Sequence, residues 1–113
     1  MLSRAMSCPN EELMVAARRV LIYLSHHRSS GLRFCHADAP MAGFSDSDLA
    51  TKHSTSGYVF MYNQAAISWA SEKQPSVALS PCEAEIIAAF EATKEAVYLR
   101  ILFQDLGISQ RRT

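Results

Sequence analysis

Hydrophobic residues recur at helical spacing near the start of the chain. Between residues 9 and 26 they form one apolar face, made of six residues: Leu13, Ala16, Ala17, Val20, Tyr23 and Leu24. This spacing predicts an amphipathic helix. Pro9 or Asn10 can start it, and the Ser29-Ser30-Gly31 sequence can end it.

A second, longer helix is predicted from Ser80 to about Leu106. Ser80-Pro81-Cys82-Glu83 has the pattern of a capping box with proline at the first helical position. Gly107 is a natural stop because glycine adopts the backbone conformation that ends helices. This helix is apolar on several sides, so one face is expected to cover a sheet and the rest to remain for a partner surface.

The residues between the two helices alternate between apolar and polar, which predicts an antiparallel meander. Three or four strands are predicted: a short candidate at residues 31–36, and strands at residues 41–48, 57–62 and 65–70. Alternation places Phe44 and Asp46 on one face of the second strand, with Phe44 packed on the long helix. It also places Ile67 and Trp69 together on the last strand. Asn63-Gln64 is the predicted tight turn.

Composition narrows the class of protein. The chain has 113 residues, enough for one domain, and 49% of them are hydrophobic, which favours a globular fold over disorder. Its net charge is zero, so it lacks the basic excess of typical nucleic-acid-binding domains. Three distant cysteines indicate neither a disulfide framework nor a zinc site. No apolar run suggests a membrane span or a signal peptide, so we predict an intracellular protein, cytoplasmic or nuclear, that is not secreted.

Several blocks of sequence, in a fixed order, resemble the ribonuclease H domain of copia-type retrotransposon polyproteins. They are F-S-D-S-D (44–48), S-T-S-G-Y-V-F (54–60), I-S-W (67–69), K-Q-P-S-V-A-L-S (73–80), E-A-E (83–85) and E-A-T-K-E-A-V-Y-L-R (91–100). The resemblance implies an α+β, partial ribonuclease H-like fold: a leading helix, an antiparallel meander and one long helix packed on it. It divides the chain into a leader (1–8), a connecting helix (9–30), a partial domain (31–107) and a tail (108–113).

The same resemblance implies a metal-dependent nuclease site. The family places one aspartate on its first core strand and one glutamate on its first helix, and these positions fall on Asp46 and Glu85. Asp48 is a further candidate ligand on the same face as Asp46. The implied ion is Mg²⁺, with Mn²⁺ as an alternative, because Mg²⁺ prefers oxygen ligands. A two-metal site would hold the attacking water and the leaving oxygen in line at a phosphorus atom.

Glu83 and Glu85 compete for the helix position. Glu83 stands three residues after Ser80, where a carboxylate folds back onto the backbone amide of the cap. Glu85 has no such local role, and the family match falls on it. We therefore predict that Glu83 caps the helix and Glu85 binds metal.

Contacts to a nucleic-acid backbone are predicted for four residues: Ser54, Thr55, Ser56 and Lys73. A turn that needs Gly57 explains the first three equally well, and Lys73 could simply be solvated. Trp69 is predicted to belong to the core rather than to stack on bases.

By this resemblance the chain hydrolyses the RNA strand of RNA–DNA hybrids during reverse transcription, together with the rest of the polyprotein. However, the family's next metal-binding aspartate lies on a strand that would follow Thr113, so the isolated chain is expected to be inactive. The alternative is a catalytically dead fragment that acts at most as a structural or interaction module.

Overall fold

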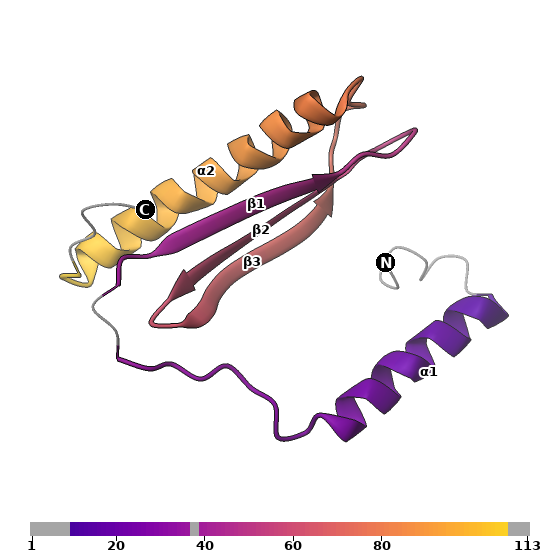
Figure 1. The fold of residues 1–113 in the computed structure, drawn as a ribbon, viewed down its shortest axis with the longest axis horizontal. Helices are drawn as coiled ribbons and strands as arrows, with labels where there is room; N and C mark the ends of the chain where they lie inside the picture. Colours follow the sequence, from indigo (N-terminus) through magenta and orange to yellow (C-terminus); the bar gives the residue numbers. More distant parts are fainter. Residues whose placement is uncertain (1–9, 37–38, 109–113) are drawn as a thin grey trace. The chain divides into compact units, whose positions relative to one another are not determined.

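The computed structural model describes residues 10–36 and 39–108, and the chain divides into two compact units, Met1–Gly31 and Leu32–Thr113 (Figure 1). The predicted leader over residues 1–8 and the possible helix start at Pro9 lie outside the described residues, as do positions 109–113 of the predicted tail.

The first unit contains the helix α1, Glu11–His26. Asn10 caps it, because the Asn10 side chain accepts a hydrogen bond of 2.8 Å from the backbone N–H of Leu13. This confirms one of the two predicted starts. The helix ends at His26, where the His27 N–H donates to the carbonyls of Tyr23 and Leu24, so it stops before the predicted Ser29–Gly31 signal. No residue of α1 is buried within its unit.

The second unit is built on a three-stranded antiparallel sheet of order β1-β2-β3. Its strands are β1 (Ala42–Asp48), β2 (Thr55–Tyr62) and β3 (Ala65–Lys73). Asn63 and Gln64 join β2 to β3 with φ angles of 50° and 67°, as a tight hairpin turn of primed type requires. The predicted turn is therefore confirmed.

The short candidate strand at residues 31–36 does not form. This segment has no strand structure in the described residues. Its backbone touches the sheet through the Cys35 N–H, which donates to the Asn63 carbonyl at the hairpin turn (3.0 Å). One hydrogen bond at a turn does not extend a ladder, so the apolar residues of this segment do not form a strand.

The long helix α2, Pro81–Asp105, begins and ends close to its predicted limits. The Ser80 side chain accepts the N–H of Glu83 (3.1 Å), and the Glu83 carboxylate accepts the N–H of Leu79 (2.8 Å). Glu83 thus reaches the residue before the cap rather than the cap itself. At the other end Gly107 has φ of +75°, the conformation that terminates helices.

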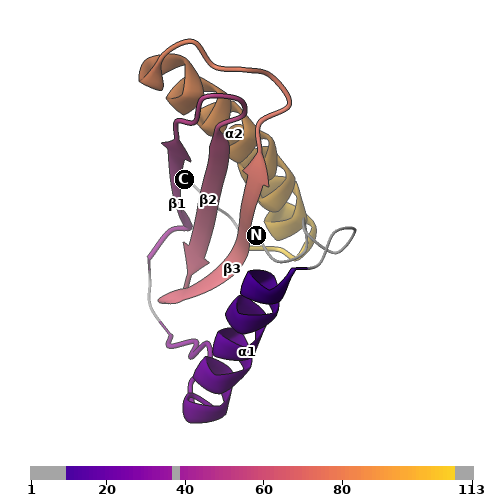
Figure 2. The same cartoon turned by 90° about the vertical axis from the view of Figure 1, so that its right-hand side faces the viewer.

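Helix α2 lies across one face of the sheet, over β1 and β2 (Figure 2). The core forms between them and comprises Met41, Phe60, Leu99 and Phe103, with Tyr58, Tyr62 and Ile67 packed around it. Gly43 in β1 permits this packing, because a Cβ at residue 43 would overlap the Phe60 ring.

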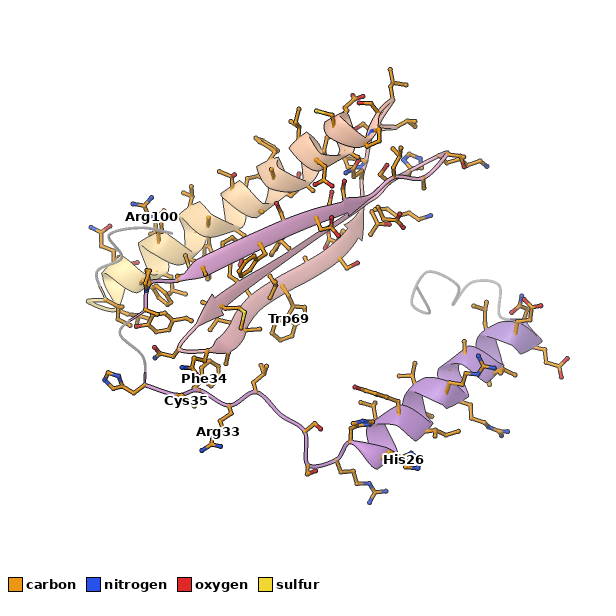
Figure 3. All side chains as sticks on the ribbon, in the orientation of Figure 1. His26, Arg33, Phe34, Cys35, Trp69 and Arg100 are labelled. Carbon is orange, nitrogen blue, oxygen red and sulfur yellow. The ribbon has the colours of Figure 1, made fainter. Side chains whose placement is uncertain are left out.

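The opposite face of the sheet is uncovered within this unit. Trp69 is 63% exposed and points away from α2 (Figure 3), and Phe44 is 60% exposed. The predicted core position of Trp69 and the predicted packing of Phe44 on the helix are both wrong. A β-bulge where β3 passes Phe60 and Met61 breaks the alternation, so Ile67 packs on the core while Trp69 does not.

The architecture is thus mixed α and β, with a leading helix, an antiparallel meander and a long helix packed on the sheet, as predicted at that level. Among the described residues, no helix combines the length and apolar character needed to cross a membrane.

Candidate functional site

Asp46 lies near the end of β1, on the face of the sheet that α2 does not cover. Its cross-strand partner is Gly57, and directly opposed residues share a face. The neighbouring residue Ser56 is buried against the start of α2, so Gly57 and Asp46 face the other way. Asp46 is exposed, and so is Asp48, two residues further on the same face.

Glu85 lies near the beginning of α2, on the side of the helix that faces β1. Ala89 and Thr93 follow at spacings of four and eight residues, which keeps them on the same side. Both line a shallow groove of about 260 Å³ together with Gly43 and Ser45 of β1. The Glu85 side chain is exposed at the end of this row.

Asp46 and Glu85 therefore come to the same end of the layer, but on opposite faces of β1. Because β1 is an edge strand, both carboxylates border the same open edge. Neither makes a hydrogen bond or ion pair with another described residue. The expectation that Asp46 shares with Phe44 the face that packs on the long helix is therefore wrong, because the ladder register turns both residues away from α2.

The described residues alone do not form a metal site. Residues 10–36 and 39–108 contain no group of three or more His, Cys, Asp or Glu side chains able to hold an ion. Asp46 and Glu85 offer the oxygen donors that Mg²⁺ prefers, but two monodentate carboxylates leave most of its six positions to other ligands.

The serine hydroxyls predicted to contact phosphate are used inside the structure. Ser54 is fully buried, and its hydroxyl accepts the Ala50 N–H at 3.4 Å. Ser56 is buried, and its hydroxyl accepts from the Gln74 amide at 2.9 Å. Both hydroxyls are thus engaged in internal hydrogen bonds, in residues that are buried.

Thr55 and Lys73 remain available for the predicted phosphate contacts. They are cross-strand partners of each other, and Asp48 completes the row as the partner of Thr55. The row therefore lies on the same face as Asp46, and Lys73 is exposed there. A phosphate bound to Lys73 would lie close to the negative charges of Asp48 and Asp46, which repel it. A cation bound to the two aspartates would remove this repulsion.

Gln74 is the residue that the sequence reasoning missed. It is only 3% exposed, and its side-chain nitrogen donates to the Ser56 hydroxyl (2.9 Å) and to the Ala84 carbonyl in the first turn of α2 (2.8 Å). Its backbone N–H donates to the Ser54 carbonyl (2.8 Å), and His53 Nδ1 lies 3.1 Å from its carbonyl. A single glutamine after a strand carries no periodic signal, so pattern analysis treats it as loop.

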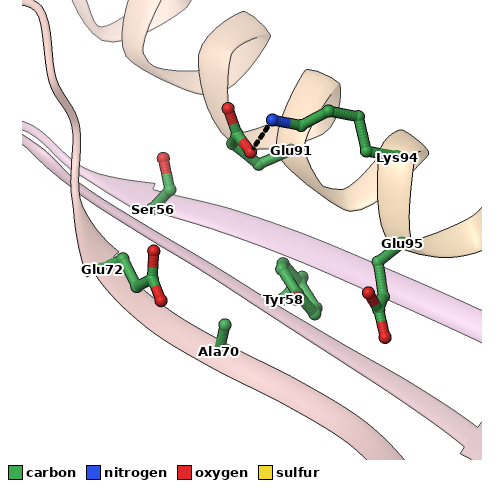
Figure 4. A pocket seen from close by; sticks show the side chains of 7 residues that line it. All are labelled: Ser56, Tyr58, Ala70, Glu72, Glu91, Lys94 and Glu95. Carbon is green, nitrogen blue, oxygen red and sulfur yellow. Dashed lines mark ion pairs between the residues drawn. The ribbon is translucent and has the colours of Figure 1, made fainter.

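A second polar region lies between α2 and the sheet, further from the helix start (Figure 4). It is a pocket of about 220 Å³ lined by Ser56, Tyr58, Ala70, Glu72, Glu91, Lys94 and Glu95. Lys94 pairs with Glu91, and Ser68 donates a hydrogen bond of 2.6 Å to Glu95. The spacing of Glu91 and Glu95 along one side of the helix was the available sequence signal for this region.

The pocket shifts the titration of Tyr58. Burial raises the pKa of the Tyr58 phenol above its ordinary value, and the negative charges of Glu95 and Glu72 raise it further, while the hydrogen bond with Ser68 acts in the opposite direction. The phenol is therefore neutral at pH 7. Three glutamates and one lysine line the pocket, so its formal charge is negative.

Curated proteins similar to this chain fall into two kinds. The chain is 44% identical to the "Secreted RxLR effector protein 161" of Plasmopara viticola, over 88% of this chain and 74% of that protein. It is 38% identical to the "Retrovirus-related Pol polyprotein from transposon TNT 1-94" of Nicotiana tabacum and 32% identical to that from transposon RE1 of Arabidopsis thaliana. These alignments cover 96% and 98% of this chain but only 8% of each polyprotein.

These relatives correct one prediction and support another. The prediction of an intracellular, non-secreted protein is contradicted, because a relative aligned over most of both chains is named as a secreted effector. The Pol polyproteins support a retrotransposon-derived segment. No protein-family model matches the chain, and no solved structure matches it.

Proposed function

We propose that this chain, which belongs to the family of the secreted RxLR effector protein 161, is the amino-terminal part of a ribonuclease H domain. The proposal is supported by the similarity of the chain to a segment of plant retrotransposon Pol polyproteins. In this proposal the fold is a partial ribonuclease H-like fold. The complete domain hydrolyses the RNA strand of RNA–DNA hybrids with Mg²⁺.

The observation that supports this proposal best is the placement of Asp46 and Glu85. They come from elements far apart in sequence and reach the same end of the sheet, where they border its open edge from opposite faces of β1. Both are exposed, and neither has a structural partner among the described residues. Carboxylates without a structural role at an unpaired edge are suited to bind a cation together with ligands from an added strand.

Within this proposal, Asp46 and Glu85 supply oxygen ligands and Asp48 supports the charge on the outer face. The resemblance to ribonuclease H domains implies further acidic ligands, which this segment does not supply. The chain spans only 8% of the length of the polyproteins. Its two carboxylates are too few to hold the two ions that hydrolysis requires. Its zero net charge also gives little attraction for a hybrid, and binding should fall steeply with salt.

A hybrid-cleavage assay tests this proposal. The chain alone and the chain extended at Thr113 by the following segment of the tobacco Pol polyprotein are compared on a labelled RNA–DNA hybrid with Mg²⁺ and with Mn²⁺. We expect cleavage only by the extended protein, and loss of it in Asp46→Asn and Glu85→Gln. Glu83→Gln is the matched control, because Glu83 serves the helix start. An extended protein that never cleaves, or that cleaves equally well after Asp46→Asn, contradicts the proposal.

A second candidate function is a non-catalytic interaction module. It is favoured by the uncovered outer face of the sheet, where Phe44 and Trp69 are exposed, and by the absence of a complete ligand group in the described residues. If this function is correct, Asp46→Asn leaves the binding of a partner protein to the outer face of the sheet unchanged, whereas Trp69→Ala abolishes it. The nuclease proposal predicts instead that Asp46→Asn abolishes metal-dependent cleavage by the extended protein, whereas Trp69→Ala leaves it unchanged.

A further inference from the structure

We propose that Gln74 is the positioning residue of the carboxylate site, holding Asp46 and Glu85 at a fixed separation. The inference rests on the proposed function only in naming those two carboxylates as ligands. It gives a role to a residue that lies within the quoted K-Q-P-S-V-A-L-S block but was assigned none from sequence, and it follows from the hydrogen bonds around one buried side chain.

One nitrogen atom joins α2, which carries Glu85, to β2, the strand that pairs with β1 and its Asp46. Gln74 Nε2 donates both to Ser56 Oγ in β2 and to the Ala84 carbonyl in α2. Ser56 precedes Gly57, the cross-strand partner of Asp46, and Ala84 precedes Glu85. The path from Asp46 to Glu85 therefore passes through one ladder pair and one amide.

The orientation of the amide is set by its surroundings. A carbonyl can only accept, so the nitrogen rather than the oxygen of Gln74 must face Ala84. The remaining oxygen, Oε1, is buried without a hydrogen-bond partner in the described structure. A buried acceptor without a partner is unfavourable, so the two Nε2 bonds must hold the side chain in place against that cost.

The apolar core does not supply this connection. Its four residues, Met41, Phe60, Leu99 and Phe103, include none from the first half of α2, where the buried residues are the alanines Ala84 and Ala88. Alanines allow close approach but add little side-chain packing. The Gln74 amide thus provides a directional link between the first turn of α2 and the sheet, beside the packing of these alanines.

The test measures geometry rather than activity, so a chain that never cleaves a hybrid leaves it valid. One nitroxide is attached to the exposed natural Cys82 in the first turn of α2, and a second to a cysteine introduced by Ser71→Cys. Ser71 pairs with Gly57 and so lies in the same row as Asp46. Cys8 and Cys35 are changed to serine, and the distance distribution is measured by pulsed electron-spin resonance.

Gln74→Met keeps the length of the side chain but removes both donated bonds, and we expect it to broaden the distribution. Leu99→Val is the control, because it loosens the core at the other end of α2. It should leave the width unchanged at temperatures well below unfolding. An unchanged width in Gln74→Met, or equal broadening in both variants, overturns the proposal.

Gln74→Glu provides a second arm that does not depend on the methionine variant folding. Burial raises the pKa of a carboxyl group at this position, and its protonated form regains one donor. The distribution should be broad above that pKa and narrow below it, while the unsubstituted protein keeps one width over the same pH range. The same width in Gln74→Glu on both sides of the transition would refute a role for the donated bonds.

Discussion

The two ends of the layer formed by α2 and the sheet are held together by different physical means. At one end, Phe60 packs against Leu99 and Phe103, and Tyr62 lies with its ring centroid 4.9 Å from that of Phe103. At the other end, which carries Asp46 and Glu85, the contacts are small alanines and the hydrogen bonds of Gln74. Apolar packing is shared among many atoms, whereas the second end depends on a few directional bonds.

This difference separates stability from site geometry. Substitutions at the packed end should change the free energy of unfolding without moving the carboxylates. Substitutions at the hydrogen-bonded end should cost less stability but change the geometry of the candidate site.

The largest loss of stability is expected from Leu99→Ala. Removing a buried leucine side chain leaves a cavity and typically costs about 2–5 kcal/mol. Leu102→Ala is the control, because Leu102 is 37% exposed and outside the core cluster. Urea denaturation followed by circular dichroism measures both. Equal losses in the two variants would show that the core does not lie where the structure places it.

Gly43→Ala tests the close packing of Phe60 on β1. The added methyl group overlaps the Phe60 ring, so we expect a loss of about 1–3 kcal/mol, typical of overpacked cores. Gly31→Ala is the matched control, since nothing lies within 4 Å of a Cβ at that position. A thermal melt decides between them, and Phe60→Leu combined with Gly43→Ala should recover part of the loss. Identical melts for the two glycine variants would contradict the packing.

The two glutamates at the start of α2 should behave differently. Glu83→Ala removes the acceptor of the Leu79 N–H and should cost about 0.5–2 kcal/mol, as other cap contacts do. Glu85→Ala should leave the melting temperature nearly unchanged, because the Glu85 side chain is exposed and has no partner in the described residues. A larger loss of stability in Glu85→Ala than in Glu83→Ala would mean that Glu85, rather than Glu83, stabilises the start of the helix.

The smallest effect is a pH dependence from Tyr58. Its pKa is raised in the folded state by burial and by Glu95 and Glu72. The stability that the neutral phenol contributes is therefore complete below the ordinary tyrosine pKa of about 10 and is lost as pH rises through the higher folded value. Comparing phenolate absorbance titrations of the protein and of Tyr58→Phe isolates this group. Glu95→Gln should lower the Tyr58 pKa, and an increase would contradict the assignment.

Sequence patterns predicted the positions of the helices and of the hairpin turn better than they predicted which side chains face α2. Asn10, Ser80 and Gly107 mark helix ends through local backbone chemistry, so single residues suffice. Asn63-Gln64 marks the hairpin for the same reason. The strand at residues 31–36 failed because pairing depends on a partner that lies elsewhere in the chain.

The facing of side chains could not be predicted, because alternation gives two faces without saying which one α2 covers. Phe44 and Trp69 were therefore placed in the core although both are exposed. The bulge opposite Phe60 and Met61 also shifts the phase of β3 by one residue, and no residue type in Ile67–Trp69 signals it. For the site, the motifs selected Asp46 and Glu85, but Gln74 became visible only through its three-dimensional contacts.

Metal binding to the purified chain tests the central claim most directly. Mn²⁺ is added to the isotope-labelled protein, and the broadening of each backbone signal is measured by nuclear magnetic resonance, since even weak binding broadens nearby signals. We expect the strongest broadening around Asp46 and Glu85, and its loss in Asp46→Asn. Strongest broadening around Glu91 and Glu95, in the pocket between α2 and the sheet, would contradict it and would place the cation site elsewhere.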